Sequence, residues 1–375
     1  MSTHIPKAVL YYDAVSAWSS AVRLALEEKG YGDDEVDLRI VDLGKGENLT
    51  PSFLRLNPKG MFHSSDVIAA PDCPSRNCAN AHRTAAEYVV RRYGKPAIVD
   101  LLDRSRSAMS RTHTTSYRPA PSLSPATIAL CAVTDSIISL LHEGPVSPEQ
   151  LFYSNARNQQ ELQEIAKTIL PDLQGRKDAL SRFLSENETS EVRVSEKTKK
   201  FWLEKKQATE ELLSVHQDAD KSDTELTTAE RDNRQKYFES SKAAWEIDLS
   251  LVLTRLSQEL TGPYALGTLN SEVSAWGLDT DFFAGDQFSI ADVHITGWLA
   301  WIIFLSGGKL GDSGSVAVQT IEQHVGGGYK LPRDAIFTDG TDATTSTEKG
   351  MQSKLAILWD AVKERPSWKR VYEGR

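Results

Sequence analysis

The sequence predicts a small α/β domain at the amino end, followed by an all-helical domain that carries a long helical insertion. Residues 9–43 alternate an apolar strand, a helical stretch and a second strand, an order typical of an α/β sheet. After residue 124, apolar side chains recur at helical spacing. The length of 375 residues suits two domains plus insertions, because one domain takes about 100 to 200 residues.

The first domain is predicted from four consecutive patterns. Residues 9–12 are apolar and aromatic, as a buried strand requires. Ser16 then opens a helix that reaches Gly30, a good helix stop. An amphipathic strand follows at residues 35–43, and a helix at residues 84–92 closes the domain. This alternation predicts a thioredoxin-like sheet.

A change in composition separates the two domains. Residues 103–124 are rich in Ser, Arg, Thr and Pro, which predicts a linker. We therefore expect the first domain at residues 1–94, the linker at 95–120 and the helical domain at 121–375. The apolar spacing of residues 127–141 predicts a packed helix that faces the first domain.

The helical domain contains a long polar insertion at about residues 145–241, which predicts a helical hairpin with a solvated loop. Residues 217–234 have almost no aliphatic side chains, so we expect poor order there. A second loop rich in Gly, Asp and Thr is expected at 307–347, and its glycines at 326–328 match no phosphate-binding pattern. Between the two lies a helical stripe predicted to be core, formed by Trp245, Leu249, Val252, Leu256 and Leu260.

Ser16 is the candidate for chemistry, because it lies where the backbone N–H groups of a helix start lack partners. A thiol placed there would be drawn toward its thiolate, since the helix dipole favours negative charge and a hydroxyl can donate to sulfur. Ser is also a preferred helix cap. The sequence leaves both roles open for Ser16.

Four blocks resemble the glutathione transferase superfamily. They are the strand and helix start at 10–23, the segment at 42–60 that ends Asn-Pro-Lys-Gly, the Gly-x-x-Phe-Ser-x-Ala-Asp signature within 283–293, and the closing helices at 355–371. The helix start is similar to that of zeta-class transferases and of the ganglioside-induced differentiation-associated protein family. The long insertion favours the second branch. The resemblance implies a thioredoxin-fold domain that binds glutathione and an all-helical second domain.

The third block has a plain physical role. Ser289 and Asp292 are spaced as a capping box, in which each side chain satisfies a backbone donor at the start of a helix. Asp292 is therefore predicted to be structural and not a catalytic acid. The apolar run at 293–305 is predicted to be the buried helix that follows.

The resemblance also implies how glutathione would be held. Ser16 would stabilise the thiolate as the catalytic residue, with Ser19 or Tyr12 as substitutes. Asn48 would reach the glycyl carboxylate, and Lys45 is a charged alternative. No metal is expected in this chemistry.

Two departures from the family pattern affect the glutathione loop. The family has a cis-proline where this chain has His63 after Phe62; a cis bond before another residue costs about 2.5 to 4 kcal/mol, so His63 is expected to be trans. The family's Glu-Ser pair is replaced by Ala81 and His82. Phe62, His63 and His82 could form a remodelled site for glutathione or another ligand, or the histidines could be polar loop residues. A locally faulty gene model at 61–82 is a further alternative.

Two functions from different classes follow. The leading hypothesis is glutathione-dependent conjugation, or a related thiol transfer, to an apolar electrophile held against the helix at 127–141, as in detoxification. The alternative is a non-catalytic member of the fold that binds apolar small molecules or partner proteins, favoured by His63 and Ala81. Disulfide reduction of the glutaredoxin type is not expected, because Ser16 stands where a cysteine would be needed.

The net charge and the cysteine count limit which binding partners and which cellular compartment are expected. The net charge of −9 gives no basic surface for nucleic acid or an anionic membrane. No secretory signal or transmembrane anchor is expected, and an odd count of 3 cysteines suits a reducing, cytoplasmic setting. Cys73 and Cys78 lack the further ligands of a structural zinc site. The resemblance implies a homodimer through the first domain, an interface that the insertion could block or replace.

Overall fold

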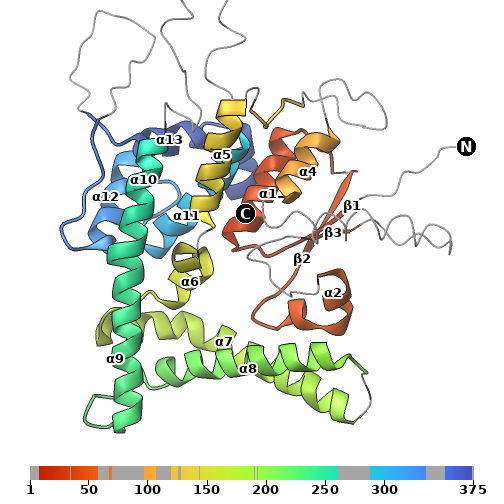
Figure 1. Ribbon diagram of the computed structural model, residues 1–375, viewed down its shortest axis with the longest axis vertical. Coiled ribbons are helices and arrows are strands. Elements are labelled where there is room, and N and C mark those ends of the chain that lie inside the picture. Colours follow the sequence, from red (N-terminus) through yellow and green to blue (C-terminus); the bar gives the residue numbers. More distant parts are fainter. Residues whose placement is uncertain are drawn as a thin grey trace, which may run out of the picture.

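A small β/α unit is followed by an all-helical region, which confirms the predicted architecture (Figure 1). The computed structural model describes residues 8–33, 35–57, 67–69, 97–106, 120–125, 128–142, 144–189, 191, 193–260, 288–334 and 351–373. The carboxyl end returns to the β/α unit, because α14 (Pro366–Trp368) and the π-helical η6 (Lys369–Glu373) contact α1 (Ala17–Glu28).

The described sheet has the strand order β2-β1-β3. β1 (Ala8–Tyr12) pairs in parallel with β2 (Val36–Ile40) and antiparallel with β3 (Val67–Ala69). α1 is the crossover between the two parallel strands, as a parallel pair requires. Both strands predicted before residue 43 are confirmed, whereas the helix predicted at residues 84–92 lies outside the described residues.

α1 begins and ends where its sequence signals place it. Ser16 is the N-cap, and Gly30 follows the helix with φ of 65°, a left-handed conformation that glycine adopts readily. Lys29 at the end of the helix forms a buried ion pair with Asp103, at 2.9 Å. Asp103 belongs to α4 (Ala97–Ser105), so part of the predicted linker is a helix that packs on α1.

Short helices follow the sheet's second strand, and beyond residue 127 the regular elements of the described ranges are helices joined by turns and loops. The remaining elements are η1 (Glu47–Leu49), α2 (Pro51–Leu56), α5 (Ile128–Leu141), η2 (Gly144–Val146), α6 (Pro148–Tyr153), α7 (Gln159–Glu188), α8 (Glu196–His216), α9 (Thr228–Lys242), the π-helical η3 (Ala243–Leu249), α10 (Ser250–Glu259), α11 (Ile290–Leu305), α12 (Gly314–Val325) and α13 (Lys354–Lys363). Among the described residues, none of these helices combines the length and apolar character needed to cross a bilayer.

α11 is the central helix, and the predicted capping box starts it. The Ser289 amide donates to Asp292 Oδ2 at 2.8 Å, and the Asp292 amide donates back to Ser289 Oγ at 3.4 Å. Almost every side chain of α11 is buried, so this helix packs on all sides. It crosses α1 so closely at Gly297 that a Cβ there would lie 2.5 Å from the carbonyl oxygen of Ala17.

The insertion contains the predicted helical hairpin, and this hairpin folds back on the β/α unit. α7 and α8 lie side by side below the sheet and α2 (Figure 1). Trp202 on α8 is fully buried, and its indole N–H donates to the Leu49 carbonyl at 2.9 Å. It packs in one apolar cluster with Leu54 and Phe183. The hairpin therefore packs against the β/α unit and shares an apolar cluster with it.

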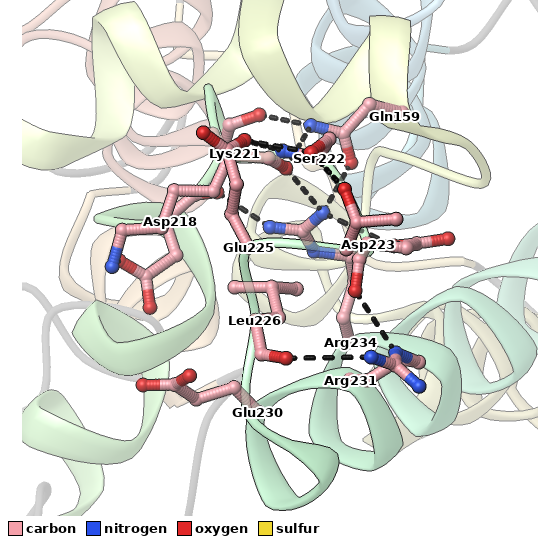
Figure 2. A network of polar contacts seen from close by, with 12 residues as sticks. Gln159, Asp218, Lys221, Ser222, Asp223, Glu225, Leu226, Glu230, Arg231 and Arg234 are labelled. Carbon is pink, nitrogen blue, oxygen red and sulfur yellow. Dashed lines mark hydrogen bonds and ion pairs between the residues drawn. The ribbon is translucent and has the colours of Figure 1, made fainter.

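The expectation of poor order at 217–234 is wrong. Arg234, only 3% exposed, donates to Gln159 Oε1 at 2.7 Å and to the Lys221 carbonyl at 2.8 Å (Figure 2). It also donates to the Asp218 carbonyl, so one guanidinium fixes the turn between α8 and α9 to the start of α7. A capping box at Thr227 then begins α9. Charged hydrogen bonds replace the apolar contacts that this segment lacks.

The expected loop at 307–347 is also wrong in part, because α12 occupies Gly314–Val325 within it. The three glycines that follow form a turn, with φ of 81°, 60° and 74° at Gly326, Gly327 and Gly328. The predicted stripe at Trp245–Leu260 is confirmed as core, since all five of its side chains are buried.

Candidate functional site

A cavity of about 310 Å³ lies where the β/α unit meets the helices. The loop between β1 and α1, the end of β2 with the loop that follows it, and the helices α6, α7 and α11 contribute its lining. Its lining comprises residues 13–18 and 40–44 together with Pro148, Glu149, Phe152, Tyr153, Asp172, Arg176 and Trp301. This volume is at the lower end of the range for small-molecule sites, about 300 to 1,000 Å³.

Ser16 lines this cavity at the amino end of α1. Its hydroxyl oxygen accepts a hydrogen bond from the Ser19 amide at 3.4 Å, so the capping role is confirmed. The next two amides, of Ala17 and Trp18, have no acceptor within the helix, as at every helix start. A hydroxyl that accepts an N–H can still donate its own proton, so the cap leaves the O–H group able to bind an anion in the cavity.

Asp13 and Ser19 fix the loop that precedes the helix. The carboxylate of Asp13 accepts the amide of Val15 at 2.8 Å, and the Asp13 amide donates to Ser19 Oγ at 3.1 Å. Both residues are buried. Ser19 does not line the cavity and its hydroxyl oxygen holds the loop, so its position favours a structural role over that of a substitute for Ser16.

Four aromatic residues contribute to the apolar lining of the cavity. Trp18 comes from α1, Phe152 and Tyr153 from α6, and Trp301 from α11. The rings of Phe152 and Tyr153 lie 5.2 Å apart, and Trp301 is held by its indole N–H, which donates to the Pro148 carbonyl at 3.0 Å. These rings give flat surfaces that suit an aromatic or alkyl ligand.

α7 contributes the charged side chains that face the end of β2. Burial raises the pKa of Asp172, with the charge of Asp42 acting in the same direction and the Arg176 guanidinium opposing both. The pKa of Asp42 is lowered by its hydrogen bond to Lys45, whose ammonium lies 2.8 Å away. Burial also raises the pKa of Tyr153, against the charge of Arg176. The phenol therefore stays neutral well beyond neutral pH.

Close backbone packing places α7 at the cavity. A Cβ on Gly175 would lie 2.4 Å from the Gly44 carbonyl oxygen, and a Cβ on Gly44 would lie 2.8 Å from Asp172 Oδ1. Only glycines allow this approach of a helix to the loop after β2. The contact therefore sets where Asp172 and Arg176 lie relative to Ser16.

Gly175→Ala should lower the free energy of unfolding by about 1 kcal/mol, because overpacking costs roughly 1–3 kcal/mol while alanine regains about 1 kcal/mol of helix propensity. It should also expose α8 to limited proteolysis as the hairpin shifts. Urea unfolding and trypsin digestion measure the two effects. Gly144→Ala is the control, since a Cβ there meets nothing within 4 Å. Unchanged proteolysis of the Gly175 variant would contradict the tight contact.

Two histidines lie behind the cavity wall. The His142 ring stacks on Trp18 with centroids 3.8 Å apart, and its Nε2 lies 3.4 Å from His294 Nδ1. Burial lowers the pKa of His294 to about 4. His294 is therefore neutral at physiological pH and supports Trp18 from within the core.

The structure brings together only part of the set predicted from sequence. Ser16 lines the cavity, whereas Tyr12, Lys45 and Asn48 do not. Asn48 is buried in η1, beneath the docked hairpin. Phe62, His63 and His82 lie outside the described residues. The expected acceptor wall at 127–141 is wrong for this cavity, because its lining includes residues of α6, α7 and α11 and none of 127–141.

Sequence reasoning missed Tyr153, Asp172, Arg176 and Trp301. One signal was present: a glycine at 175, inside an otherwise strong helix and one turn before Ala179, indicates a close helix contact. In the described part of the chain, no group of three or more His, Cys, Asp or Glu side chains is arranged to hold a metal ion.

No protein-family model matches the chain. A stretch of 72 residues is 42% identical to Glutathione S-transferase 1 of Dianthus caryophyllus and covers 18% of this chain. The match spans 31% of that relative's length. Among solved structures, a variant of poplar glutathione transferase F1 aligns over 98% of this chain and 97% of its own, with 14% identity and a TM-score of 0.43. A glutathione transferase homologue from Sulfitobacter, solved with bound glutathione, aligns over 99% of both chains with 12% identity and a TM-score of 0.40.

Proposed function

We propose that this protein is a glutathione transferase that binds the glutathione sulfur beside Ser16 and transfers it to an apolar electrophile. The observation that carries the proposal is the position of Ser16: at the amino end of α1, it lines a cavity together with four aromatic residues. The local identity to a plant glutathione transferase supports the same assignment.

The chemistry needs a stabilised thiolate and an acceptor held close to it. The thiol loses its proton to solvent, and the Ser16 hydroxyl and the first amides of α1 stabilise the sulfur anion. With an aryl chloride, the sulfur forms a bond to the ring carbon and chloride leaves with the electrons of the broken bond. The protein gains rate by lowering the pKa of the thiol and by holding the two reactants together.

The cavity also offers groups for the peptide part of glutathione. The sequence lacks the carboxylate that the family uses for the γ-glutamyl ammonium, since Ala81 stands at that position. Asp13, Asp42 and Asp172 place carboxylates in the cavity lining instead, which supports binding of an ammonium there. The proposed site is therefore reorganised around α7.

The proposal also covers the subfamily, the cellular compartment and the oligomeric state of the protein. The helix start at 10–23 and the α7–α8 hairpin support a place near the zeta class or the differentiation-associated branch. Conjugation in detoxification, in a reducing cytoplasmic compartment, fits the exposed free thiol of Cys131. A homodimer would have to leave this face of η1 and α2 to the hairpin, because Trp202 already packs with Leu49 and Leu54 there.

A second candidate is a binding protein without turnover. The buried carboxylate of Asp13, three residues before Ser16, favours it, because a negative charge near the helix start opposes a thiolate. The aromatic lining would then hold an apolar ligand. Turnover, measured separately from binding, distinguishes the two functions.

Ser16→Ala should keep most of the affinity for glutathione and lose roughly 10- to 100-fold in turnover, since hydrogen bonds to charged groups contribute about 1.5–3 kcal/mol. Isothermal titration with glutathione and conjugation of chlorodinitrobenzene measure the two quantities. Ser20→Ala is the matched control, because Ser20 is also buried in the first turn of α1 but does not line the cavity.

Two further outcomes test the assignment. Ser16→Asp keeps a helix cap but places a negative charge at the sulfur, so it should abolish turnover in a stably folded protein. Absence of glutathione binding at millimolar concentration, in folded wild-type protein, would contradict the transferase. Binding of chlorodinitrobenzene without turnover would then support the second candidate.

A further inference from the structure

The inserted helix α7 carries a cation into the proposed site. Arg176 is half-buried on α7, and among the described residues it is the one basic side chain that lines the cavity. It lines the same cavity as the β1–α1 loop that holds Ser16. The acceptor half of the site therefore includes a fixed positive charge.

Two of the four acidic residues that line the cavity, Asp42 and Asp172, contact other groups. Asp42 pairs with Lys45 at 2.8 Å. Asp172, one turn before Arg176, has its Oδ1 against Gly44. Within the part of the chain that the structure describes, Arg176 forms no ion pair with a carboxylate. Its guanidinium charge opposes the effect of burial on the pKa of Asp172 and on the pKa of Tyr153.

Aromatic rings adjoin this cation. The guanidinium carbon of Arg176 lies 5.8 Å from the centre of the Tyr153 ring, and Phe152 and Trp301 extend the same wall. A cation over an aromatic face is held in a preferred orientation. A ligand with a flat apolar body and one anionic end would match the wall and the guanidinium together.

We propose that Arg176 determines acceptor specificity by binding a carboxylate of the electrophile. The proposal rests on the transferase function proposed above and adds the class of acceptor: an apolar electrophile, such as an aryl halide, that bears a carboxylate. The planar fork of the guanidinium suits two parallel hydrogen bonds to a carboxylate. The acidic side chains elsewhere in the lining would repel the carboxylate of the acceptor, so they favour the orientation in which it meets Arg176.

The test compares a chloronitrobenzoate with its methyl ester, which share the reacting carbon and differ in charge. In both, the glutathione sulfur bonds to the ring carbon, chloride leaves with the bonding electrons, and the thiol proton goes to solvent. Because an ester activates the ring more than a carboxylate does, each kcat/KM is divided by the rate constant of the uncatalysed reaction with glutathione. On this scale the wild-type protein should favour the acid about tenfold or more, as expected for a hydrogen-bonded charge pair.

Arg176→Gln should lower kcat/KM for the acid about 10- to 100-fold and leave the ester within a factor of about three. Arg176→Lys should restore part of the preference, because it keeps the charge and loses the fork. Arg182→Gln is the matched control, since this arginine lies on the same helix, 62% exposed, and does not line the cavity. Equal losses on both acceptors, or no preference for the acid in wild type, would overturn the proposal.

The role of Arg176 can be tested by binding even if the protein does not catalyse the transfer. If neither acceptor is turned over, fluorescence titration of the wild-type protein with the chloronitrobenzoate measures binding alone. Affinity that falls in Arg176→Gln and stays in Arg182→Gln supports the carboxylate site without catalysis. Undetectable binding, or equal affinity in both variants, overturns it.

Discussion

Gly297→Val should lower the free energy of unfolding by roughly 3 kcal/mol or more, because overpacking a rigid helix contact is among the larger single-residue effects. A Cβ at Gly297 would lie 2.5 Å from the Ala17 carbonyl oxygen and 3.3 Å from the Ala21 Cβ. Relief requires α1 to move away from α11. Ala17 directly follows Ser16, so the same movement would displace the start of α1 at the cavity.

Two measurements check this result. Urea unfolding gives the loss of stability, and titration with glutathione gives the loss of affinity expected when α1 shifts. Gly311→Val is the control, since a Cβ at Gly311 meets nothing within 4 Å and the position is exposed. A Gly297 variant as stable as the wild type would mean that α1 and α11 can separate without strain.

The buried histidine His294 should make the protein unstable in mild acid. Burial lowers its pKa to about 4 in the folded state, from an ordinary value of 6.5. As pH falls, the unfolded chain takes up the proton first. The stabilisation is therefore complete above about pH 6.5 and is lost progressively toward pH 4, by about 3 kcal/mol in total, with no further loss from this group below that pH.

The measurement is the free energy of unfolding at several pH values between about 6.5 and 5, above the range where most carboxylates titrate. His294→Leu should reduce the slope by up to one proton, about 1.4 kcal/mol for each pH unit. His324, whose pKa burial and the charge of Arg157 also lower to about 4, should keep part of the slope. Ile295→Val, a neighbouring core change, should lower stability equally at every pH. An identical slope in the wild type and His294→Leu would contradict a neutral buried imidazole.

Local signals in the sequence predicted the starts of the decisive helices correctly. The caps at Ser16 and Ser289 depend on hydrogen bonds to amides three residues ahead, so short patterns contain the necessary information. The strand at residues 8–12 is equally local, because its apolar pattern marks it as buried. These features place Ser16 at a helix start before any tertiary contact is known.

The acceptor side of the cavity could not be predicted in this way. Arg176 lines the same cavity as Ser16 only because α7 folds back on the loop after β2, and no local pattern specifies a contact across more than a hundred residues. The close contact between Gly175 and Gly44 decides this docking. The polar composition of residues 217–234 also led to a wrong prediction of poor order. There the buried guanidinium of Arg234 orders a segment that has few apolar side chains.

The contact between Trp202 and Leu49 also affects how the chain folds during its synthesis on the ribosome. These residues are separated by 153 positions, so a ribosome adding about 5 to 20 residues per second needs roughly 8 to 30 s to supply the partner of the first. Throughout that interval Leu49 and Leu54 on the nascent amino-terminal unit have no α8 to cover them. During synthesis this apolar face is therefore a natural binding surface for chaperones, and slow translation of the α7–α8 segment would prolong its exposure to aggregation.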